Sequence, residues 1–387
     1  MQKILIVNSF YYPDIRGGAE ISTQLLAEGL SENYEVHVLT TGKQKHNILK
    51  EEVNGVKVHR IPCKNIYWPG QIYPRSNVSK CVWHLINNYN PIQQKMITEV
   101  IREIAPSLIH TQNLMGIGTY LWNVAAKLDI PVVHTTRDYA LMEPVNNKYV
   151  NKFIRYFNKK RSMRVDHVVG ISKFILEQHQ ERLLFSDTVF STVHNVVSAP
   201  RYPRQTPEEG KPLTLGYYGQ LEDNKGVNIL LDAVKKISLS KVEKIFVCGV
   251  GSKERELKEA FQSDERIVFK GKLPIEDVYR IMASTDLTIV PSVWEEPFGR
   301  VIIESYNQGT PVIASNRGGI PEIIESEKYL FNVQNESDLI NKIEKFASLD
   351  RNEIDKEIKR VYENSIKYQD NIELYIKVYK GLMGANV

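Results

Sequence analysis

The sequence predicts an α/β protein with two doubly wound, Rossmann-like domains. Short apolar segments typical of buried strands alternate with segments of helical periodicity along most of the chain. The alternation starts twice in the same way, because KILIVNSF (3–10) and LTLGYYGQ (213–220) each lead through a glycine-bearing loop into a helix. A chain of 387 residues is also long for one core. We therefore expect one domain over residues 1–200 and a second over 201–365.

Each domain is expected to hold several further strands, separated by helical stretches. In the first half the first helix is ISTQLLAEGL, and strands are expected at EVHVLT, VKVHRI, LIHTQN, PVVHTT, HVVGIS and TVFSTVHN. In the second half the first helix is VNILLDAVKKI, and strands are expected at KIFVCGV, RIVFKG, LTIVPS and TPVIAS. The segment 198–212, with four Pro among fifteen residues, is the expected linker. Strands joined through helices form parallel sheets, which bind ligands outside the carboxyl ends of their strands.

Composition and cysteine usage are those of a soluble cytoplasmic protein, with 42% hydrophobic and 25% charged residues. Apolar runs such as ILIV (4–7) are far shorter than the roughly 20 residues that span a bilayer, and the N-terminus lacks a secretory signal pattern. Cys63, Cys81 and Cys248 are widely spaced, with no CxxC and no His at ligand spacing. They indicate reduced thiols rather than disulfides or a zinc site.

Basic residues are concentrated in KYVNKFIRYFNKKRSMR (148–164), which has seven Lys and Arg and no acidic residue. Four of them follow helical spacing, with aromatic residues between them: Lys148, Lys152, Arg155 and Lys159. This pattern is typical of a helix that lies on an anionic membrane surface. The alternative is a solvated helix face whose aromatic side chains enter the core. Binding to nucleic acid is not expected, because no recognition module accompanies the charge.

The segment 288–324 combines a strand, a loop, a helix and a Gly-Gly loop. The helix is expected to start near Gly299 or Arg300, where its free N–H groups suit a phosphate or sugar hydroxyls. Glu304 follows three aliphatic residues inside that helix, as a buried carboxylate for which we expect no partner within the chain. It suits the paired hydroxyls of a ribose, and Glu296 those of a hexose. Alternatively, both are acids favoured by the helix dipole.

This segment resembles the signature of glycosyltransferase family 4, the large retaining GT-B family. The shared features are a Glu, seven residues and a second Glu, with Pro-Phe-Gly between and a later Gly-Gly loop. The resemblance covers nearly the whole chain and includes PDIRGGAE (13–20), HTTRDYAL (134–141), ISKF (171–174), VHNVV (193–197) and GYYGQLEDNKGV (216–227). It implies a GT-B fold, in which two Rossmann-like domains face each other across a cleft. It also implies that a C-terminal helix, 366–387, crosses back to the first domain. This helix is expected from the aromatic-rich amphipathic pattern of YENSIKYQDNIELYIKVYKGLMG (362–384).

The resemblance assigns roles to individual residues. Lys225 would hold the donor diphosphate, Glu304 the nucleotide ribose and Glu296 the transferred sugar, while Asp138 would orient an acceptor or sugar hydroxyl. Lys225, Glu296 and Asp138 are therefore the expected catalytic residues, without a metal ion or cofactor. The remaining expected donor-binding residues are Gly17, Gly18, Gln220, Lys272, Leu273, Phe298, Gly299, Arg300 and Val301.

Three positions depart from the family pattern. Gln220 replaces an Arg of the diphosphate element, Arg137 replaces a His before Asp138, and Val196 replaces a Gly after Asn195. One hypothesis is that Arg137 compensates for the positive charge missing at Gln220. The alternative is a surface Arg, with Lys225 sufficient alone.

The expected activity is transfer of a sugar, with retention, from a UDP- or GDP-sugar to a hydroxyl of a saccharide acceptor. The basic first domain favours a lipid-linked acceptor at the inner face of the cytoplasmic membrane, in bacterial surface polysaccharide or lipopolysaccharide synthesis. Two alternatives are a nucleotide-sugar epimerase on the same fold and a non-catalytic nucleotide-sugar binder.

Overall fold

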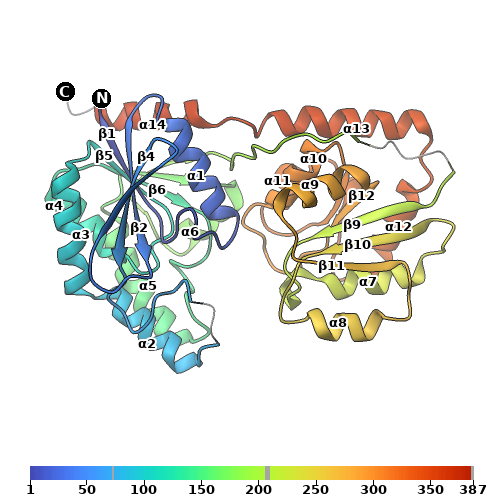
Figure 1. Cartoon of the computed structure of the whole chain (residues 1–387), viewed down its shortest axis with the longest axis horizontal. Helices are drawn as coiled ribbons and strands as arrows, with labels where there is room; N and C mark the ends of the chain where they lie inside the picture. Colours follow the sequence, from blue (N-terminus) through green and yellow to red (C-terminus); the bar gives the residue numbers. More distant parts are fainter. Residues whose placement is uncertain (72–73, 205–209, 385–387) are drawn as a thin grey trace. The chain divides into compact units, whose positions relative to one another are not determined.

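The chain forms two compact units (Figure 1) in a computed structural model that describes residues 1–71, 74–204 and 210–384. One unit comprises Met1–Val196 with Asn371–Val387, and the other comprises Val197–Asp370. The chain thus passes between units at Val196 and again at Asp370, close to the positions 200 and 366 expected from the sequence. The expected linker belongs to the second unit as far as it is described, and its residues 205–209 lie outside the described residues.

Unit 1 contains an eight-stranded sheet in the order β3-β4-β2-β1-β5-β6-β7-β8. The strands are β1 (Lys3–Val7), β2 (Glu35–Gly42), β3 (Leu49–Val53), β4 (Val56–Pro62), β5 (Leu108–Thr111), β6 (Val132–Thr136), β7 (His167–Gly170) and β8 (Val189–Thr192). All neighbours pair in parallel except β3, which is antiparallel to β4. The expectation of a parallel sheet is therefore wrong at this edge, where β3, a strand that was not predicted, runs antiparallel. This edge strand reads LKEEV and is largely exposed, so it lacks the apolar run that marks the other strands.

Helices cover both faces of this sheet (Figure 1). They are α1 (Gly18–Leu30), α2 (Asn77–Asn88), α3 (Pro91–Ile104), α4 (Tyr120–Lys127), α5 (Lys148–Ser162), α6 (Lys173–Glu181) and α14 (Ile372–Gly384). Side chains alternate along β1, so Ile4 and Ile6 share a core with α1 and α14, whereas Leu5 and Val7 share one with α3 and α4. Two apolar layers therefore hold the central strand in place.

The C-terminal segment 362–384 is two helices rather than the single expected helix. Residues 385–387 of that expected helix lie outside the described residues. Helix α13 (Arg351–Ile366) belongs to unit 2, and α14 begins only at Ile372. Asn371 donates from Nδ2 to the carbonyl of His194, which anchors the start of α14 to unit 1. Tyr379 is fully buried there, with its hydroxyl 2.6 Å from Nδ1 of His110 on β5. The break occurs because the two halves of the segment pack on different units.

Unit 2 contains a six-stranded parallel sheet in the order β11-β10-β9-β12-β13-β14. Its strands are β9 (Leu213–Tyr218), β10 (Val242–Cys248), β11 (Ile267–Gly271), β12 (Leu287–Val290), β13 (Val312–Ser315) and β14 (Leu330–Phe331). Its helices are α7 (Val227–Lys236), α8 (Glu254–Phe261), α9 (Ile275–Ser284), α10 (Arg300–Asn307), α11 (Ile320–Ile323), α12 (Glu336–Phe346) and α13, with short 3₁₀ turns η1 (Asp223–Lys225) and η2 (Glu327–Tyr329). The two-residue strand β14 escaped prediction because it is too short to show periodicity.

Strand order reverses at one place in each sheet. In unit 1, β1 pairs with both β2 and β5, and in unit 2, β9 pairs with both β10 and β12. Loops that leave such neighbours at their carboxyl ends run in opposite directions and leave a crevice where doubly wound sheets bind ligands. We therefore expect ligand sites at the loops after β1 and β5 and at those after β9 and β12.

Candidate functional site

In unit 2, the loops after β9 and β12 are tied to each other at the strand-order reversal. The carbonyl of Asn224 accepts N–H bonds from Val293 (3.0 Å) and Trp294 (3.3 Å). Gly226 has a φ of 66°, and a Cβ there would lie 2.0 Å from the carbonyl oxygen of Pro291. Only glycine allows this approach, so the Lys-Gly pair positions Lys225 beside the second loop.

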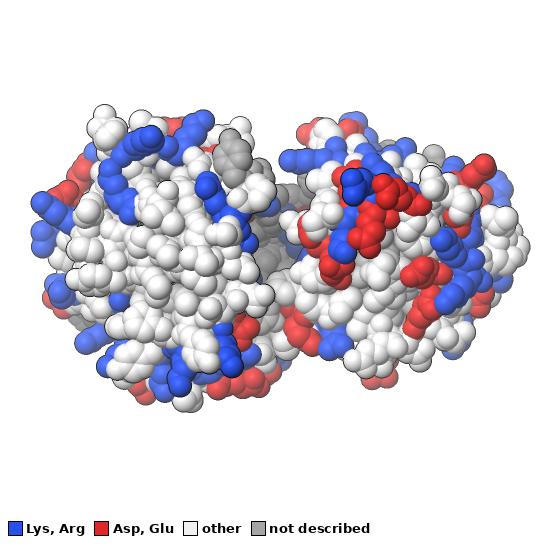
Figure 2. All heavy atoms as spheres, turned by 90° about the horizontal axis from the view of Figure 1, so that it is seen from below, with Lys and Arg blue, Asp and Glu red and all other residues white. Residues whose placement is uncertain are grey.

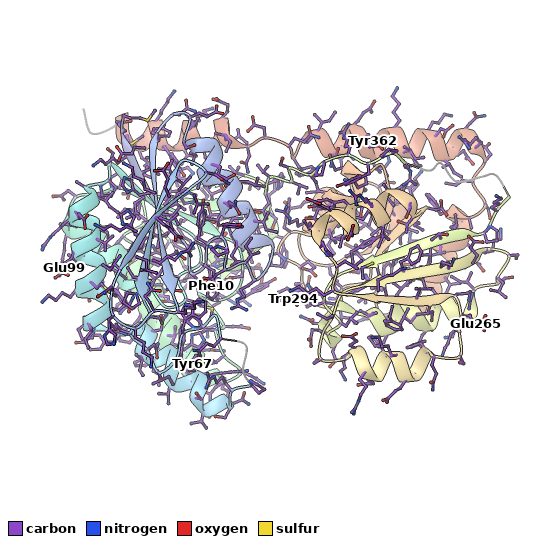
Figure 3. All side chains as sticks on the ribbon, viewed as in Figure 1. Phe10, Tyr67, Glu99, Glu265, Trp294 and Tyr362 are labelled. Atoms are coloured by element: carbon purple, nitrogen blue, oxygen red, sulfur yellow. The ribbon has the colours of Figure 1, made fainter. Side chains whose placement is uncertain are left out.

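Lys225 and Glu296 meet across these two loops. Lys225 Nζ lies 2.6 Å from Oε1 of Glu296, and the hydroxyl of Ser292 donates to the same oxygen at 2.7 Å. The ammonium also lies 5.2 Å from the ring centroid of Trp294, a cation–π distance. Trp294 is labelled in Figure 3. The Lys225 and Glu296 side chains retain 22% and 13% exposure, so solvent reaches the pair. A cation and a carboxylate are thus held together at the edge of the sheet.

The Gly-Gly loop after β13 holds the glutamate loop from the other side. Gly319 donates its N–H to the carbonyl of Glu296 at 2.7 Å, and Gly318 donates to the carboxylate of Glu295 at 2.6 Å. Arg317 Nη1 is 2.9 Å from that carboxylate. Sequence reasoning missed the supporting roles of Glu295 and Arg317, which depend on β12 and β13 being neighbours. Their only local signal is that they adjoin the two motifs.

The N-terminus of α10 opens beside this pair. The helix begins at Arg300, so the predicted start near Gly299 or Arg300 is confirmed. Gly299 occupies the N-cap with a φ of 102°, and as a glycine it has no side chain to cap the first amides. Phe298 is buried, with its ring centroid 6.1 Å from that of Tyr368. The amide groups at this end are therefore positioned for an anion or hydroxyl groups.

Glu304 has a partner within the chain, contrary to the sequence-based prediction. Arg300 Nε lies 2.7 Å from Oε1 of Glu304, and the two side chains are only 13% and 11% exposed. The physical reason is helical spacing, since residues four apart lie on the same face of a helix. Tyr279 of α9 lies beside them, and burial above all raises its pKa to about 12. The carboxylate of Glu304 is thus buried, oriented and neutralised by Arg300.

The other expected donor-binding residues of unit 2 lie in two environments. Leu273 and Val301 pack in one apolar cluster with Tyr218, Tyr279 and Met282, which places the loop after β11 beside α10. Lys272 and Gln220 are exposed, and the backbone carbonyl of Gln220 accepts from the hydroxyl of Tyr217 at 2.6 Å. The structure therefore brings Leu273 and Val301 together and leaves the side chains of Lys272 and Gln220 facing solvent.

In unit 1, the carboxylate of Glu20 accepts hydrogen bonds from the amides that precede α1. It accepts the N–H groups of Arg16 at 3.2 Å and Gly17 at 2.8 Å. Burial raises the pKa of Glu20, and these hydrogen bonds oppose the rise. The side of Gly17 that a Cβ would occupy has nothing within 4 Å. The amide of Gly17 is therefore already hydrogen-bonded, and Gly17 leaves open space beside the start of α1, where Gly18 is the first helical residue.

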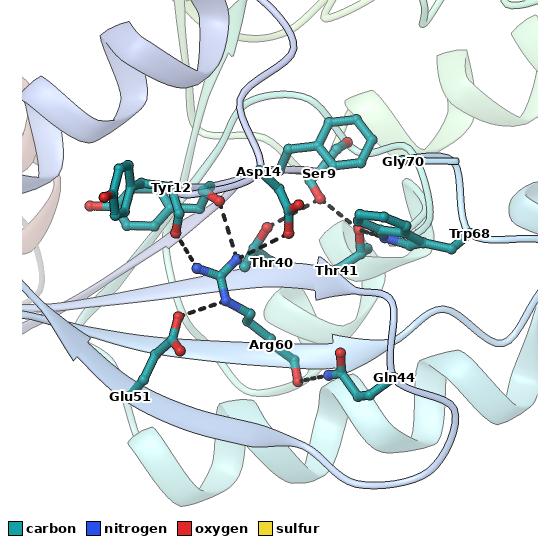
Figure 4. A network of polar contacts seen from close by, with 12 residues as sticks. Ser9, Tyr12, Asp14, Thr40, Thr41, Gln44, Glu51, Arg60, Trp68 and Gly70 are labelled. Carbon is teal, nitrogen blue, oxygen red and sulfur yellow. Dashed lines mark hydrogen bonds and ion pairs between the residues drawn. The ribbon is translucent and has the colours of Figure 1, made fainter. Parts of the chain in front are cut away.

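A network centred on Arg60 fixes the loop that leads to this glycine pair (Figure 4). Arg60 Nη1 donates to the carbonyl of Tyr11 at 3.1 Å, Nη2 donates to that of Tyr12, and Nε donates to Glu51 at 2.6 Å. The hydroxyl of Thr41 donates to the carbonyl of Ser9 at 2.7 Å. Arg60 is a positioning residue that the sequence did not reveal, because it reaches this loop only through the pairing of β2 with β4.

Arg137 and Asp138 follow β6, next to the loop after β5. Arg137 is buried, so the alternative of a surface Arg is wrong. Its Nε donates to Oε1 of Gln112 at 2.7 Å, and its Nη1 donates to Oδ1 of Asn195. Asp138 accepts from Asn113 Nδ2 at 3.0 Å and from its own turn, and burial raises its pKa. Arg137 thus links the element that follows β6 to the one that contains Asn195 and Val196.

Beside these residues lies a cavity of about 50 Å³. Gln112, His134 and Asp138 are among the residues that line it. Within the described residues, Gln112 Nε2 and His179 Nε2 are buried at its wall without a hydrogen-bond partner. Such orphaned donors and acceptors are compatible with an ordered water or a ligand hydroxyl.

The helix predicted over the basic segment is confirmed as α5. The sequence left undecided whether its aromatic side chains face solvent or enter the core. Tyr149, Phe153 and Tyr156 are exposed, so the alternative in which the aromatic side chains enter the core is wrong for these three. Across the described ranges, no helix has both the length and the apolar character needed to span a membrane.

Comparison with known proteins agrees with this architecture. Residues 16–201 match the family model described as Glycosyltransferase Family 4, and residues 198–377 match Glycosyl transferases group 1. The 42.6 kDa protein in the cps region of Klebsiella pneumoniae is 32% identical over 98% of this chain and 100% of its own. Among solved structures, sucrose-phosphate synthase from Thermosynechococcus elongatus has a TM-score of 0.76 at 18% identity, with complete coverage of both chains. Anabaena HepE, solved in complex with UDP, has a TM-score of 0.72 at 16% identity, covering 99% of this chain and 100% of its own.

Two Rossmann-like units and these structural neighbours define a GT-B fold. The chain belongs to glycosyltransferase family 4, as the two family models, which together cover residues 16–377, show.

Proposed function

We propose that the protein transfers a sugar, with retention of configuration, from a UDP- or GDP-sugar to a hydroxyl of a saccharide acceptor. The observation that carries this proposal is the Lys225–Glu296 pair in the loops that lead to the N-terminus of α10. A cation and the amides of a helix N-terminus suit a diphosphate, whereas a carboxylate suits sugar hydroxyls. Their convergence at the strand-order reversal of unit 2 supports a nucleotide-sugar site there.

In this proposal the donor spans unit 2 from Lys225 to Glu304. The diphosphate lies between Lys225 and the amides of Phe298, Gly299 and Arg300. The ribose hydroxyls donate to the carboxylate of Glu304, which Arg300 already holds in one orientation. Leu273 and Val301 would flank the base, with Lys272 at its solvent side.

The bond between the anomeric carbon and the diphosphate oxygen breaks, and a bond from that carbon to the acceptor oxygen forms on the same face. The acceptor proton passes to the departing phosphate oxygen, so the step balances without a further base. Negative charge grows on the phosphate as it leaves, and Lys225 stabilises it. Glu296 binds the transferred sugar. We propose that the reaction uses no cofactor or metal ion, with Lys225 and α10 supplying the positive field.

We place the acceptor on unit 1, with Asp138 orienting a hydroxyl beside the polar cavity. The Klebsiella relative is named as a protein of a cps region, which supports a role in surface polysaccharide synthesis. A lipid-linked saccharide is the proposed acceptor, and the inner face of the cytoplasmic membrane the proposed location. The basic helix α5 supports that location.

Donor consumption measured with and without a saccharide acceptor tests the proposal. Transfer predicts nucleoside diphosphate release that depends on acceptor. An epimerase would convert the donor without releasing the nucleotide, and a non-catalytic binder would do neither. UDP, GDP and ADP should first be compared by thermal shift, because a ligand present at about 100 times its Kd stabilises the protein by about 2.7 kcal/mol.

A further inference from the structure

Helix α2 carries a stripe of exposed apolar side chains. Val78, Val82, Leu85 and Tyr89 are 74%, 42%, 38% and 75% exposed. Their spacing of four, three and four residues places them on one face of the helix and its cap. The opposite face anchors the helix, since Trp83 is buried and donates from Nε1 to the carbonyl of Tyr67 at 2.8 Å. The exposed stripe is therefore additional to what holds α2 in the fold.

Helix α5 packs against α2 and carries a second stripe (Figure 1). Arg161 of α5 donates from Nη1 to Oδ1 of Asn88 at 2.7 Å, which joins the two helices. Tyr149, Phe153 and Tyr156 are 73%, 49% and 53% exposed and follow the same helical spacing. The two stripes therefore belong to neighbouring helices of unit 1.

Basic residues accompany these stripes, and acidic residues are missing from both helices. Lys148, Lys152 and Lys159 of α5 are exposed, and Arg155 is partly exposed. Neither 77–90 nor 148–164 contains an Asp or Glu. In the view of Figure 2, unit 1 presents a broad area of uncharged side chains bordered largely by Lys and Arg, with some acidic side chains at its lower border. Large apolar side chains exposed in this number on two packed helices mark an interaction surface.

We propose that this face binds an anionic lipid bilayer. The α2–α5 surface consists of Val78, Val82, Leu85, Tyr89, Tyr149, Phe153 and Tyr156 with Lys148, Lys152, Arg155 and Lys159. Lysine ammonium groups would bind lipid phosphates, while the aliphatic and aromatic side chains enter the boundary between headgroups and acyl chains. The stripe on α2 adds exposed aliphatic side chains to this surface, whereas α5 contributes aromatic ones. The inference deepens the proposed function and rests on it only for the lipid-linked acceptor.

Charge and chemistry argue for lipid as the occupant. Aromatic rings that alternate with Lys at helical spacing match the interfacial layer of a membrane, where each ring has an apolar body and each cation a nearby phosphate. Binding should therefore require anionic lipid and weaken with salt. An acidic protein partner would use the charge but would give no affinity for vesicles.

Co-sedimentation of the full chain with vesicles tests the inference. Phosphatidylcholine vesicles with phosphatidylglycerol should bind the protein at low ionic strength, and phosphatidylcholine alone should bind it weakly. Lys152→Glu with Lys159→Glu should reduce the partition coefficient at least about tenfold. The matched control is Lys356→Glu with Lys359→Glu, exposed positions of α13 that change the net charge equally and should leave binding unchanged.

A second pair of variants isolates the α2 stripe. Val82→Asn with Leu85→Asn should also weaken binding at least about tenfold, whereas Leu239→Asn with Ile366→Asn, at exposed apolar positions of unit 2, should not. The inference is overturned if the native protein does not bind anionic vesicles, or if the α2 variant binds them as strongly as its control does. Transfer to a soluble acceptor separates the two proposals. Lost vesicle binding with intact transfer defeats the membrane surface alone, and vesicle binding without transfer defeats the proposed function alone.

Discussion

Lys225 Nζ lies 2.6 Å from Oε1 of Glu296, although the two residues are 71 positions apart in the chain. In the proposed donor site, the donor diphosphate and the carboxylate of Glu296 both bind the ammonium group of Lys225. The two therefore compete for Lys225. Donor binding would therefore exchange the partner of Lys225 and release Glu296 towards the sugar hydroxyls. The ion pair holds both side chains in a defined orientation.

Lys225→Gln should lower kcat/KM at least about 100-fold, since an electrostatic stabiliser of the leaving group is lost. Steady-state transfer assays measure this effect. Lys236→Gln is the matched control, because it also removes a lysine from an ion pair of unit 2, with Glu336. If the two variants have the same kcat/KM, Lys225 does not act on the diphosphate.

Glu304→Ala should abolish the thermal shift produced by the nucleotide, because the ribose loses its acceptor. The variant should also unfold at lower temperature, since Arg300 loses its partner, at an expected cost of about 1–3 kcal/mol. Arg300→Ala breaks the same ion pair and should retain most of the shift. Equal loss of the shift in both variants would assign Glu304 a structural role.

Arg137→Ala should weaken donor binding about tenfold or more if Arg137 replaces the charge missing at Gln220. Adding Gln220→Arg to this variant should then restore the affinity, as measured by calorimetry with the nucleotide. A purely structural effect, through lost bonds to Gln112 and Asn195, would not respond to a charge at position 220. Unchanged donor affinity and turnover in Arg137→Ala would rule out compensation.

Unit 1 should lose stability in acid before unit 2 does. All nine His lie in residues 37–194, and burial lowers the pKa of seven of them, to about 4 for His179 and about 3 for His110. The unfolded chain binds these protons from pH 6.5 downwards while the folded chain does not, so stability falls as the pH drops from 6.5 towards 4. His179 alone contributes about 3 kcal/mol of this loss.

Two buried carboxyl groups of unit 1 act in the opposite direction. Burial raises the pKa values of Glu20 and Asp138, so their protonation in acid relieves a cost in the folded state. The more numerous histidines should prevail. Hydrogen exchange measured along a pH series reports each unit separately, and earlier opening of unit 2 would contradict this expectation.

Transfer activity should be unchanged after treatment with EDTA, because Lys225 and the α10 amides are proposed to carry the positive field. The measurement is the initial rate before and after chelation, with added Mg²⁺ or Mn²⁺ as the comparison. A rate that falls with EDTA and returns with a divalent ion would overturn the metal-free proposal.

Helix starts and strands with apolar runs were predictable because their causes are local. The start of α10 follows from Gly299 and the aliphatic residues after it, and β1 and β9 follow from runs long enough to be buried. The Arg300–Glu304 ion pair was also predictable, since its members are four residues apart on one helix. It was missed because Glu304 was considered without the residue one turn before it. Strands β3 and β14 were not predictable, one being polar and exposed and the other only two residues long.

The sequence by itself determined two α/β units, the glycine loops that follow their strands and the family to which the chain belongs. These features depend on short-range periodicity and on residues such as Gly226, which has a positive φ that favours glycine. Only the tertiary structure decided that Lys225 meets Glu296, that Arg137 meets Asn195 and that Gly318 holds Glu295. Each of these contacts joins loops from different strands, so it exists only once the sheet has set the order of its strands.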